Sequence, residues 1–483
     1  MARSLSLFFR STIRTGRTPL VATFRSFSTS RILREHSNKI IFNFRSDTAT
    51  IPTDEMFDIM KAASKGDDVL KVHEDTSYPI CLLAISTDAT RNRTPIHSCN
   101  PNHSRAHSFQ TTNPSPSPTT PLILRIQESR DVNDLESYVA SLCGHEDALF
   151  CVSGTMTNQL GIRSLLVQPP HSVLLDSRAH IFLWEAGGIA FHSQANVTPV
   201  VAKNGVHLTL EEVKTGILEE DVHTAPTRSM LYRSALVQTM TIIHADITSR
   251  HPVIALENTL NGMIFPLSEI SRISEYGRSR GIKMHLDGAR AWNASMATGI
   301  PLAEYGRHFD SMSLCLSKGI GAPIGSILVG SRDLIKRARH FRKLFGGGWR
   351  QAGSLAAVAR HCLDTIWPTM PGTHALTRHL ADSLRALGLG LAFPVMTNMV
   401  HAQLAPVRLT VGDIAPHLLQ EDIRIAGKPD ATTSRLVLHH QITPEAVETL
   451  IRVIGEVVRA KGKVVEKAES VEVGNAMDYP AAN

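Results

Sequence analysis

The sequence contains few cysteines, and their spacing argues against a disulfide framework or a common zinc motif. Six cysteines occur in 483 residues, they are scattered along the chain, and none belongs to a Cys-X-X-Cys pair. This pattern is typical of free thiols in a reducing compartment. The sequence also lacks a run of about 18 consecutive apolar residues, so we expect no membrane-spanning helix.

The beginning of the chain lacks acidic residues. The formal net charge of the whole chain is +6, but residues 1–34 contain seven arginines and no Asp, Glu or Lys. The rest therefore carries −1 in all, and we expect no basic surface for nucleic acid in the folded part. An Arg- and Ser-rich segment with interspersed apolar residues is typical of a mitochondrial transit peptide. We predict a mitochondrial protein; the alternative is a basic arm without an address on a cytosolic protein.

The remaining composition indicates a large globular chain. With 42% hydrophobic residues, a chain of this length can bury a sizeable core and is expected to contain more than one domain. Strand and helix patterns begin near Ile40, and those beyond Gly372 indicate a smaller α+β unit. We predict a large domain over residues 40–371, a small C-terminal domain over 372–460, and a disordered tail over 461–483.

Two stretches interrupt the strand and helix patterns. Residues 77–130 are rich in Ser, Thr, Pro, Asn and His without a sustained apolar period, and residues 228–252 show no clear amphipathic face. A structureless loop as long as the first stretch is unusual inside a compact domain. The first stretch holds four potential metal ligands, but their spacing matches no standard zinc motif, so we expect no metal site. These ligands are His97, Cys99, His103 and His107.

The chemistry of the chain is predicted from two residues that each follow a buried strand pattern. Lys318 follows an apolar pattern that we expect to end at Ser317, and glycines come next. A desolvated lysine can attack a carbonyl carbon, although Lys318 alone would more often be a surface residue in a Gly-rich turn. Asp287 ends another strand pattern, and alone it would indicate a helix N-cap. Together, a carboxylate for a pyridine nitrogen and an amine for an aldehyde are what pyridoxal phosphate requires, so we predict this cofactor.

Two further positions are candidates for the same site. Gly154 and Thr155 lie in a small polar turn between a strand pattern and a helix pattern. Such a turn offers backbone N–H groups and a hydroxyl to a phosphate, although helix capping would also explain it. His180 lies just past the strand pattern Ser172–Asp176, where ligands gather in open α/β sheets. A histidine there can stack on a planar ring or move a proton, but an isolated loop histidine is more often structural.

Eight short motifs, taken in order, resemble the low-specificity L-threonine aldolases, which are pyridoxal phosphate enzymes related to aspartate aminotransferase. The resemblance spans most of residues 40–457. It implies an α/β fold of PLP fold type I, with a mostly parallel seven-stranded sheet in the large domain and a smaller C-terminal α+β domain. The motifs are Phe44-Arg-Ser-Asp-Thr-Ala-Thr, Gly66-Asp-Asp-Val, Ser153-Gly-Thr-Met-Thr-Asn-Gln, Ala179-His-Ile-Phe-Leu-Trp-Glu-Ala-Gly-Gly, Leu256-Glu-Asn-Thr, His285-Leu-Asp-Gly-Ala-Arg, Leu316-Ser-Lys-Gly and Gly346-Gly-Gly-Trp-Arg-Gln.

The resemblance implies roles in cofactor binding and catalysis. Lys318 is similar to the lysine that holds the cofactor as an imine, and Asp287 to the partner of the pyridine nitrogen. His180 corresponds to the histidine that stacks on the ring near the substrate hydroxyl, and His223 is a second catalytic candidate. The phosphate-binding positions are matched by Gly154, Thr155 and Arg350.

The resemblance also implies a substrate and a reaction. Ser46, Arg290 and Arg435 match positions that hold the carboxylate of an amino acid. The implied activity is retro-aldol cleavage of L-threonine or L-allo-threonine to glycine and acetaldehyde. It takes place in a homodimer or homotetramer whose sites form between subunits. β-Elimination and aminotransfer are the rival reactions of the same cofactor.

The chain departs from the family pattern at three places. Leu70 stands where the family usually has an aromatic residue, and residues 77–130 and 228–252 have no counterpart. We hypothesise that both stretches are translated introns or errors of the gene model, because the pattern resumes cleanly on either side. If they are genuine, a catalytically impaired homologue that acts only as a binding protein is the rival from another class.

Overall fold

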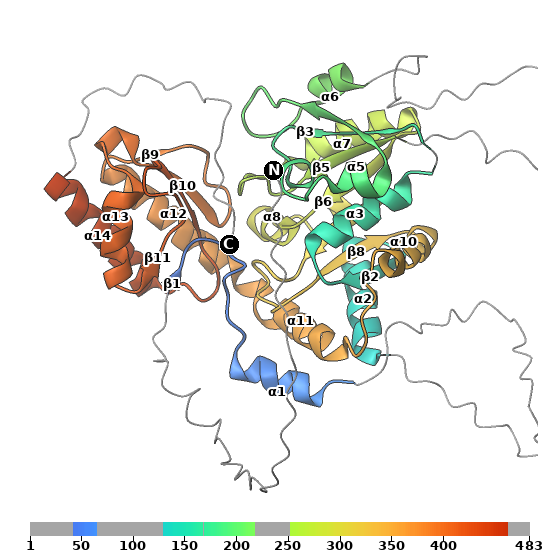
Figure 1. The fold of residues 1–483 in the computed structure, drawn as a ribbon, viewed down its shortest axis with the longest axis horizontal. Coiled ribbons are helices and arrows are strands. Elements are labelled where there is room, and N and C mark those ends of the chain that lie inside the picture. Colours follow the sequence, from blue (N-terminus) through green and yellow to red (C-terminus); the bar gives the residue numbers. More distant parts are fainter. Residues whose placement is uncertain (1–41, 65–128, 168, 218–251, 462–483) are drawn as a thin grey trace, which may run out of the picture. The chain divides into compact units, whose positions relative to one another are not determined.

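The computed structural model describes residues 42–64, 129–167, 169–217 and 252–461 (Figure 1). The predicted transit peptide, Leu70, His223 and residues 462–483 of the predicted tail lie outside these residues. The four potential metal ligands and most of the two interrupting stretches also lie outside them. At the end of the first stretch, Ser129 and Arg130 belong instead to the start of a helix, so the predicted stretch extends two residues too far. Lys461, the first residue of the predicted disordered tail, is instead the last residue of helix α14 (Pro444–Lys461).

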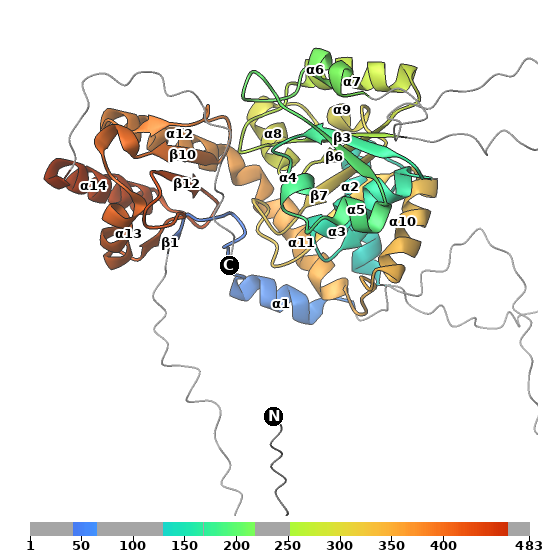
Figure 2. The same ribbon diagram turned by 45° about the horizontal axis from the view of Figure 1, so that its top comes forward.

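A seven-stranded sheet is the largest of the three sheets in the residues that the structure describes (Figures 1 and 2). In order across the sheet, the strands are β2 (Asp147–Cys151), β8 (Ser326–Gly330), β7 (Ser311–Cys315), β6 (Lys283–Asp287), β5 (Val253–Glu257), β3 (Ser172–Asp176) and β4 (Asn196–Val200). The neighbours from β7 to β4 are parallel, whereas β8 runs antiparallel to both β7 and β2. The prediction of a mostly parallel seven-stranded sheet is therefore confirmed.

Except at its partly exposed edge strand β4, the sheet is buried on both faces, as its continuous apolar strands predict. Ala148 and Phe150 face one core, and the alternate residues Leu149 and Cys151 face another, because successive side chains of a strand point to opposite sides. Buried residues of the first core come from helices α1 (Asp54–Ala62), α2 (Arg130–Cys143), α6 (Leu210–Gly216), α7 (Leu267–Ser279), α8 (Ala291–Thr298), α9 (Leu302–Gly306) and α11 (Gly353–Thr365). Those of the second come from α3 (Gly154–Leu165), α4 (His180–Leu183), α5 (Gly188–Ser193) and α10 (Arg332–Leu344).

A separate hydrophobic core is built mainly from the C-terminal part of the chain. Its elements are α12 (Met370–Ala386), β9 (Gly390–Leu391), β10 (Met399–Gln403), α13 (Val411–Gln420), β11 (Ile423–Arg424), β12 (Thr433–Val437) and α14 (Pro444–Lys461), with a short 3-10 turn at Ala405–Val407. A second 3-10 turn, Trp367–Thr369, precedes α12, and its Trp367 packs against the first core of the large sheet. The N-terminal segment joins this core, because β1 (Phe42–Asn43) pairs with β11 and Phe44 is fully buried within it. The predicted domain boundary near residue 372 stays a prediction.

The sequence predicts no membrane-spanning helix and predicts free cysteine thiols, and the described residues bear on both predictions. Within them, no helix is both long and apolar enough to cross a membrane. Cys143, Cys315 and Cys362 are buried free thiols, as expected.

The strand before Lys318 ends earlier than expected. β7 ends at Cys315 rather than Ser317, because the backbone N–H groups of Leu316 and Ser317 both donate to the Gly325 carbonyl (3.0 and 3.2 Å). The chain therefore leaves the sheet before it reaches the lysine.

Candidate active site

The candidate residues gather where neighbouring parallel strands end. Asp287 is the last residue of β6 and Glu257 is the last residue of β5. His180 begins α4 shortly after β3 ends, and Lys318 follows β7. The carboxyl ends of parallel strands form one edge of an open sheet, which is where such folds bind ligands. This arrangement brings the predicted residues Asp287, Lys318 and His180 to the same edge.

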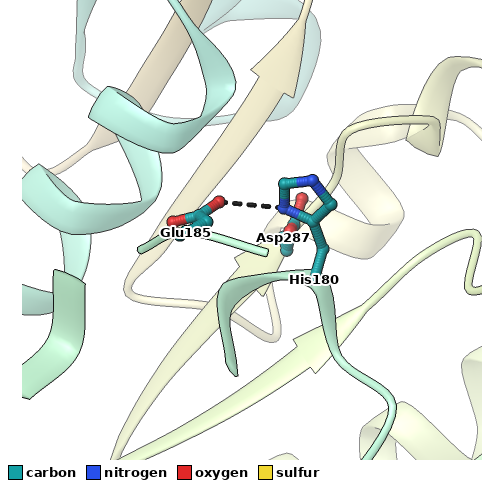
Figure 3. A group of neighbouring side chains, drawn as sticks. All are labelled: His180, Glu185 and Asp287. Atoms are coloured by element: carbon teal, nitrogen blue, oxygen red, sulfur yellow. Dashed lines mark hydrogen bonds and ion pairs between the residues drawn. The ribbon is translucent and has the colours of Figure 1, made fainter. Parts of the chain in front are cut away.

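His180 and Glu185 form a hydrogen-bonded pair at this edge (Figure 3). The Nδ1 atom of His180 lies 3.1 Å from Oε1 of Glu185, and Figure 3 shows the other ring nitrogen on the far side of the ring. The Glu185 side chain is fully buried, whereas 42% of the His180 side chain is exposed. Burial lowers the pKa of His180, but the hydrogen bond with Glu185 and the charge of Asp287 outweigh it and raise that pKa.

Two side-chain amides hold the Glu185 carboxylate. Asn158 donates to its Oε1 atom (2.9 Å), and Gln159 donates to its Oε2 atom (2.7 Å). An added Cβ at Gly188 would lie 2.6 Å from the Gln159 carboxamide, so this position must be glycine for the amide to reach Glu185. Burial and the nearby Asp287 raise the pKa of Glu185 above its ordinary value.

The Asp287 carboxylate is 1% exposed and accepts two hydrogen bonds. Its Oδ2 atom accepts from Asn158 (3.0 Å), and its Oδ1 atom accepts from the backbone N–H of Ala289 (3.1 Å). Each carboxylate oxygen has a second lone pair, so the group can accept further bonds. Asp287 is thus fixed in place while it retains capacity for another donor.

Glu257 adds a third carboxylate to this group. It accepts a hydrogen bond from the backbone N–H of His180 (2.8 Å). Burial and the charge of Asp287 raise the pKa of Glu257 to about 8, although His180 and Lys318 act in the opposite direction. Three acidic groups, Glu185, Glu257 and Asp287, are therefore crowded at this end of the sheet, and the crowding favours the protonated form of Glu257.

One geometric alternative is a metal ion. Ligand atoms of His180, Glu185 and Asp287 lie within 4.8 Å of one another. The hydrogen bonds described above already engage the His180 Nδ1 atom and oxygens of both carboxylates. A bound cation would have to displace them.

Arg290 is positioned by a buried ion pair with Asp47. Its Nε and Nη2 atoms donate to the two Asp47 oxygens at 2.9 and 2.6 Å, and the Asp47 side chain is fully buried. Although burial opposes its charge, Arg290 and, less strongly, Lys318 hold the pKa of Asp47 down at about 2. Because the positive charges of Arg290 and Lys318 both lower the pKa of Asp47, these two predicted residues lie within electrostatic reach of the same carboxylate.

The other two predicted carboxylate-binding residues, Arg435 and Ser46, belong to segments that contact each other. Arg435, on β12, donates to the backbone carbonyl of Arg45 (3.3 Å), next to the predicted Ser46. The Ser46 hydroxyl contacts the Thr48 hydroxyl (2.9 Å). Burial, Arg435 and Arg290 together lower the pKa of His401 to about 4, so both guanidinium groups lie within electrostatic reach of one side chain.

The predicted phosphate-binding positions lie at the beginning of α3. Gly154 is its first residue, and an added Cβ there would lie 2.6 Å from the Cys315 sulfur, so only glycine fits without a shift. The Ser153 hydroxyl caps the helix by accepting from the Met156 N–H (3.2 Å), and Thr155 is exposed. Arg350 is exposed in the single chain.

Four residues of the site were not assigned a role from the sequence: Asp47, Asn158, Glu185 and Glu257. All of them lie in the motifs that carry the family resemblance, and this was the signal that could have found them. Their roles depend on contacts between residues 27 to 351 positions apart, such as Asn158–Glu185, Asn158–Asp287 and Asp47–Asn398. Local sequence patterns do not report such contacts.

Comparisons with known proteins show the family and the fold of the chain. The family model described as beta-eliminating lyase matches residues 125–235 and 232–406. The low-specificity L-threonine aldolase of Candida albicans is 42% identical over 333 residues, which are 68% of this chain and 81% of that protein. Among solved structures, the Leishmania major threonine aldolase aligns with a TM-score of 0.59 at 18% identity, covering 86% of this chain and 99% of that one.

A second solved structure supports the fold assignment. A serine palmitoyltransferase from S. paucimobilis, solved with bound PLP, aligns with a TM-score of 0.52 at 16% identity and covers 70% of this chain and 79% of that one. The chain thus has the fold of the PLP fold type I enzymes. The match to the Candida albicans protein covers more than two thirds of each of the two chains. This match and the family model show that the chain belongs to the family of the low-specificity L-threonine aldolases, within the beta-eliminating lyases.

Proposed function

We propose that this protein cleaves L-threonine and L-allo-threonine to glycine and acetaldehyde, with pyridoxal phosphate as its cofactor. One observation carries the proposal: in a chain of the threonine aldolase family, Asp287 ends β6, Lys318 follows β7 and His180 follows β3, so the parallel strands bring all three to one edge of the sheet. A carboxylate, an amine and an imidazole in one place are the groups that the reaction needs.

The residues of the site fit the cofactor at its ring. Burial and repulsion from the Asp287 carboxylate raise the pKa values of both Glu185 and Glu257. A protonated pyridine nitrogen beside Asp287 would supply a balancing positive charge. Lys318 would supply the amine that bonds to the cofactor aldehyde. When bound, pyridoxal phosphate supplies an electron sink for the electron pair released at Cα of the substrate.

The residues also fit the cofactor at its phosphate. The start of α3, a helix of 12 residues, presents backbone N–H groups that no helical carbonyl accepts. Gly154 lets this helix start approach β7 closely, and the exposed Thr155 offers a hydroxyl. These features support the phosphate-binding roles of Gly154 and Thr155.

The amino-acid carboxylate would be held by Arg290, with Arg435 and Ser46 beside it. Asp47 engages the Nε and Nη2 atoms of Arg290, which leaves other N–H groups of the guanidinium to donate to a substrate. A guanidinium whose side chain is already fixed loses little freedom on binding. A held carboxylate would orient the Cα–Cβ bond for cleavage.

His180 would remove the proton from the substrate hydroxyl. Its Nδ1 atom is engaged by Glu185, so Nε2 is the nitrogen available to a substrate. The hydroxyl proton moves to Nε2 as the Cα–Cβ bond breaks, the oxygen becomes the carbonyl oxygen of acetaldehyde, and a proton later returns to Cα to complete glycine. A positioned base of this kind typically contributes about 10²–10⁴-fold to the rate.

A cleavage assay on the purified protein tests the proposal. With pyridoxal phosphate present, L-threonine should yield glycine and acetaldehyde in equal amounts, and removal of the cofactor should abolish both products. Formation of 2-oxobutyrate and ammonia instead would indicate β-elimination, the reaction named in the description of the matching family model. Absence of any product, with no visible absorbance from bound cofactor, would indicate a catalytically impaired homologue.

We further propose that two or four chains assemble and that Arg350 serves the site of a neighbouring subunit. Arg350 is exposed in the single chain, and the nearby α5 and α10 expose Phe191 (81%) and Leu344 (67%). Mixing a Lys318→Ala protein with an Arg350→Ala protein tests this idea. If sites are shared, random reassembly of dimers should restore about a quarter of the activity. No recovery after verified subunit exchange would contradict it.

Residues 1–34 are proposed to direct the protein to mitochondria. Their seven arginines and lack of acidic residues support this address. A fluorescent reporter carrying these residues should enter mitochondria, whereas a version with the arginines changed to glutamine should stay in the cytosol. Cytosolic fluorescence of both reporters would defeat the proposal.

A further inference from the structure

One side-chain amide joins the two carboxylates of the site. The Nδ2 atom of Asn158, on α3, lies 2.9 Å from Oε1 of Glu185 and 3.0 Å from Oδ2 of Asp287. A carboxamide NH₂ group has two hydrogens, so Asn158 can donate one to each carboxylate. Asn158 is 2% exposed, and the two residues that it joins are 3% and 1% exposed. Buried carboxylates that lie this close together require such donors.

The orientation of this amide is fixed from behind by His285. The Nε2 atom of His285 lies 3.1 Å from Oδ1 of Asn158, and its Nδ1 atom lies 2.8 Å from the Ser311 hydroxyl. Because an amide oxygen only accepts, the hydrogen of His285 must sit on Nε2, and Nδ1 must accept from Ser311. Burial lowers the pKa of His285 to about 4, so the ring is neutral at physiological pH and has one consistent set of partners. Rotation of the Asn158 amide by half a turn would set its oxygen against two carboxylates.

Gln159, the next residue, provides an internal comparison. Its Nε2 atom donates to Oε2 of Glu185 (2.7 Å), and no hydrogen bond to Asp287 is among its contacts. Both amides therefore support the Glu185–His180 pair, but only Asn158 also supports Asp287.

We propose that Asn158 is a positioning residue that couples the Glu185–His180 pair to Asp287. We also propose that His285 holds the Asn158 amide in the orientation that this coupling requires. Through Glu185, Asn158 sets the position of His180, and through Asp287 it sets the carboxylate that would pair with the pyridine nitrogen of the cofactor. The idea rests on the proposed function for the identity of the reaction. Coupling to the cofactor through Asp287 can be measured without turnover.

Isosteric substitutions separate hydrogen bonding from space filling. Asn158→Leu keeps most of the volume but removes both donated hydrogen bonds, and Gln159→Met does the same for the neighbouring amide. Two quantities are measured on each purified holoenzyme: the rate of pyridoxal phosphate release into a trapping protein, and kcat for threonine cleavage at saturating cofactor. The thermal unfolding midpoint of each variant confirms that it is folded.

The expected pattern differs between the two neighbours. Hydrogen bonds to charged groups are worth about 1.5–3 kcal/mol, so Asn158→Leu should release the cofactor roughly tenfold or more faster and should also lower kcat. Gln159→Met should lower kcat and leave cofactor release within about twofold of the unsubstituted protein. Equal effects of the two substitutions on cofactor release, or no effect of Asn158→Leu, would overturn the coupling.

A second pair of variants tests the role of His285. His285→Gln keeps an N–H group that can donate to Asn158, and His285→Leu does not. Cofactor release should stay near normal in the first variant and accelerate in the second. Equal behaviour of both variants would show that His285 only fills space. If none of the proteins, including the unsubstituted one, cleaves threonine, the proposed function fails, while the release measurements still decide whether Asn158 is coupled to the cofactor.

Discussion

Replacement of Asp47 by Asn is expected to destabilise the fold and to loosen Arg290. Although burial opposes the charge of Asp47, the two hydrogen bonds from Arg290 help to hold its pKa at about 2, against an ordinary value of 3.8. Because one pKa unit corresponds to about 1.36 kcal/mol, the charge of Asp47 contributes roughly 2.5 kcal/mol to stability at neutral pH. Removing one partner of a buried ion pair typically costs about 3–5 kcal/mol. We therefore expect Asp47→Asn to lower the free energy of unfolding by about 2.5–5 kcal/mol.

Urea denaturation of the purified protein measures this loss. Asp58→Asn is the matched control, because the Asp58–Lys61 ion pair is exposed at both ends and its removal should leave the midpoint unchanged. A carboxyl whose pKa is lowered by folding stabilises the fold at pH values above its pKa in the unfolded chain. It loses that contribution as the pH falls towards its pKa in the folded chain. The difference between the Asp47→Asn protein and the unsubstituted protein should therefore shrink between about pH 4 and pH 2. An unchanged midpoint at neutral pH, or a difference that grows on acidification, would refute the reasoning.

Three further outcomes follow from the site. Lys318→Ala should abolish threonine cleavage while its far-ultraviolet circular dichroism stays unchanged; normal cleavage would refute the role of Lys318. Gly154→Ala places a methyl group against the Cys315 sulfur, at 2.6 Å, and should weaken cofactor binding about tenfold, measured by titration. The double variant with Cys315→Ala should recover part of that loss, and a failure to recover any would show that the contact is not the cause. Folded Glu257 has a pKa of about 8 against 4.5 when unfolded, so the folded chain holds an extra proton between these values and loses stability as pH rises through them. Glu257→Gln should remove this pH dependence from the thermal unfolding midpoint, and a slope that persists in the variant would locate it elsewhere.

Much of the fold follows from local patterns. The strand Ser172–Asp176 begins and ends where its apolar pattern predicts, and β6 ends at Asp287 as predicted, because short apolar runs between turn signals leave little choice of boundary. The ligand-binding edge could also be expected, since Asp287 and Lys318 each follow a strand and parallel strands end at one edge. The end of β7 was misjudged by two residues, because the Gly325 carbonyl accepts from residues that the apolar pattern includes.

The rest of the site depends on tertiary contacts that leave no periodic trace. β1 is two residues long and pairs with a strand about 380 residues away, so neither partner shows an alternating pattern. Asn158 looks like an ordinary residue of a helix, and its function exists only because Glu185 and Asp287 arrive from two other segments. Asp47 is likewise defined by Arg290, 243 residues further along the chain. Such roles are recognised from motifs only when their family is known.

The pairing of the first described strand with residues near the other end of the chain has a consequence for synthesis. Phe42 and Asn43 pair with Ile423 and Arg424 in a parallel two-stranded sheet. The C-terminal core therefore cannot close around Phe44 until almost the entire polypeptide has left the ribosome. During synthesis, residues 42–44 therefore remain unpaired until the C-terminal residues have been made. A bulky group attached just before Phe42 is expected to interfere with this late step of assembly.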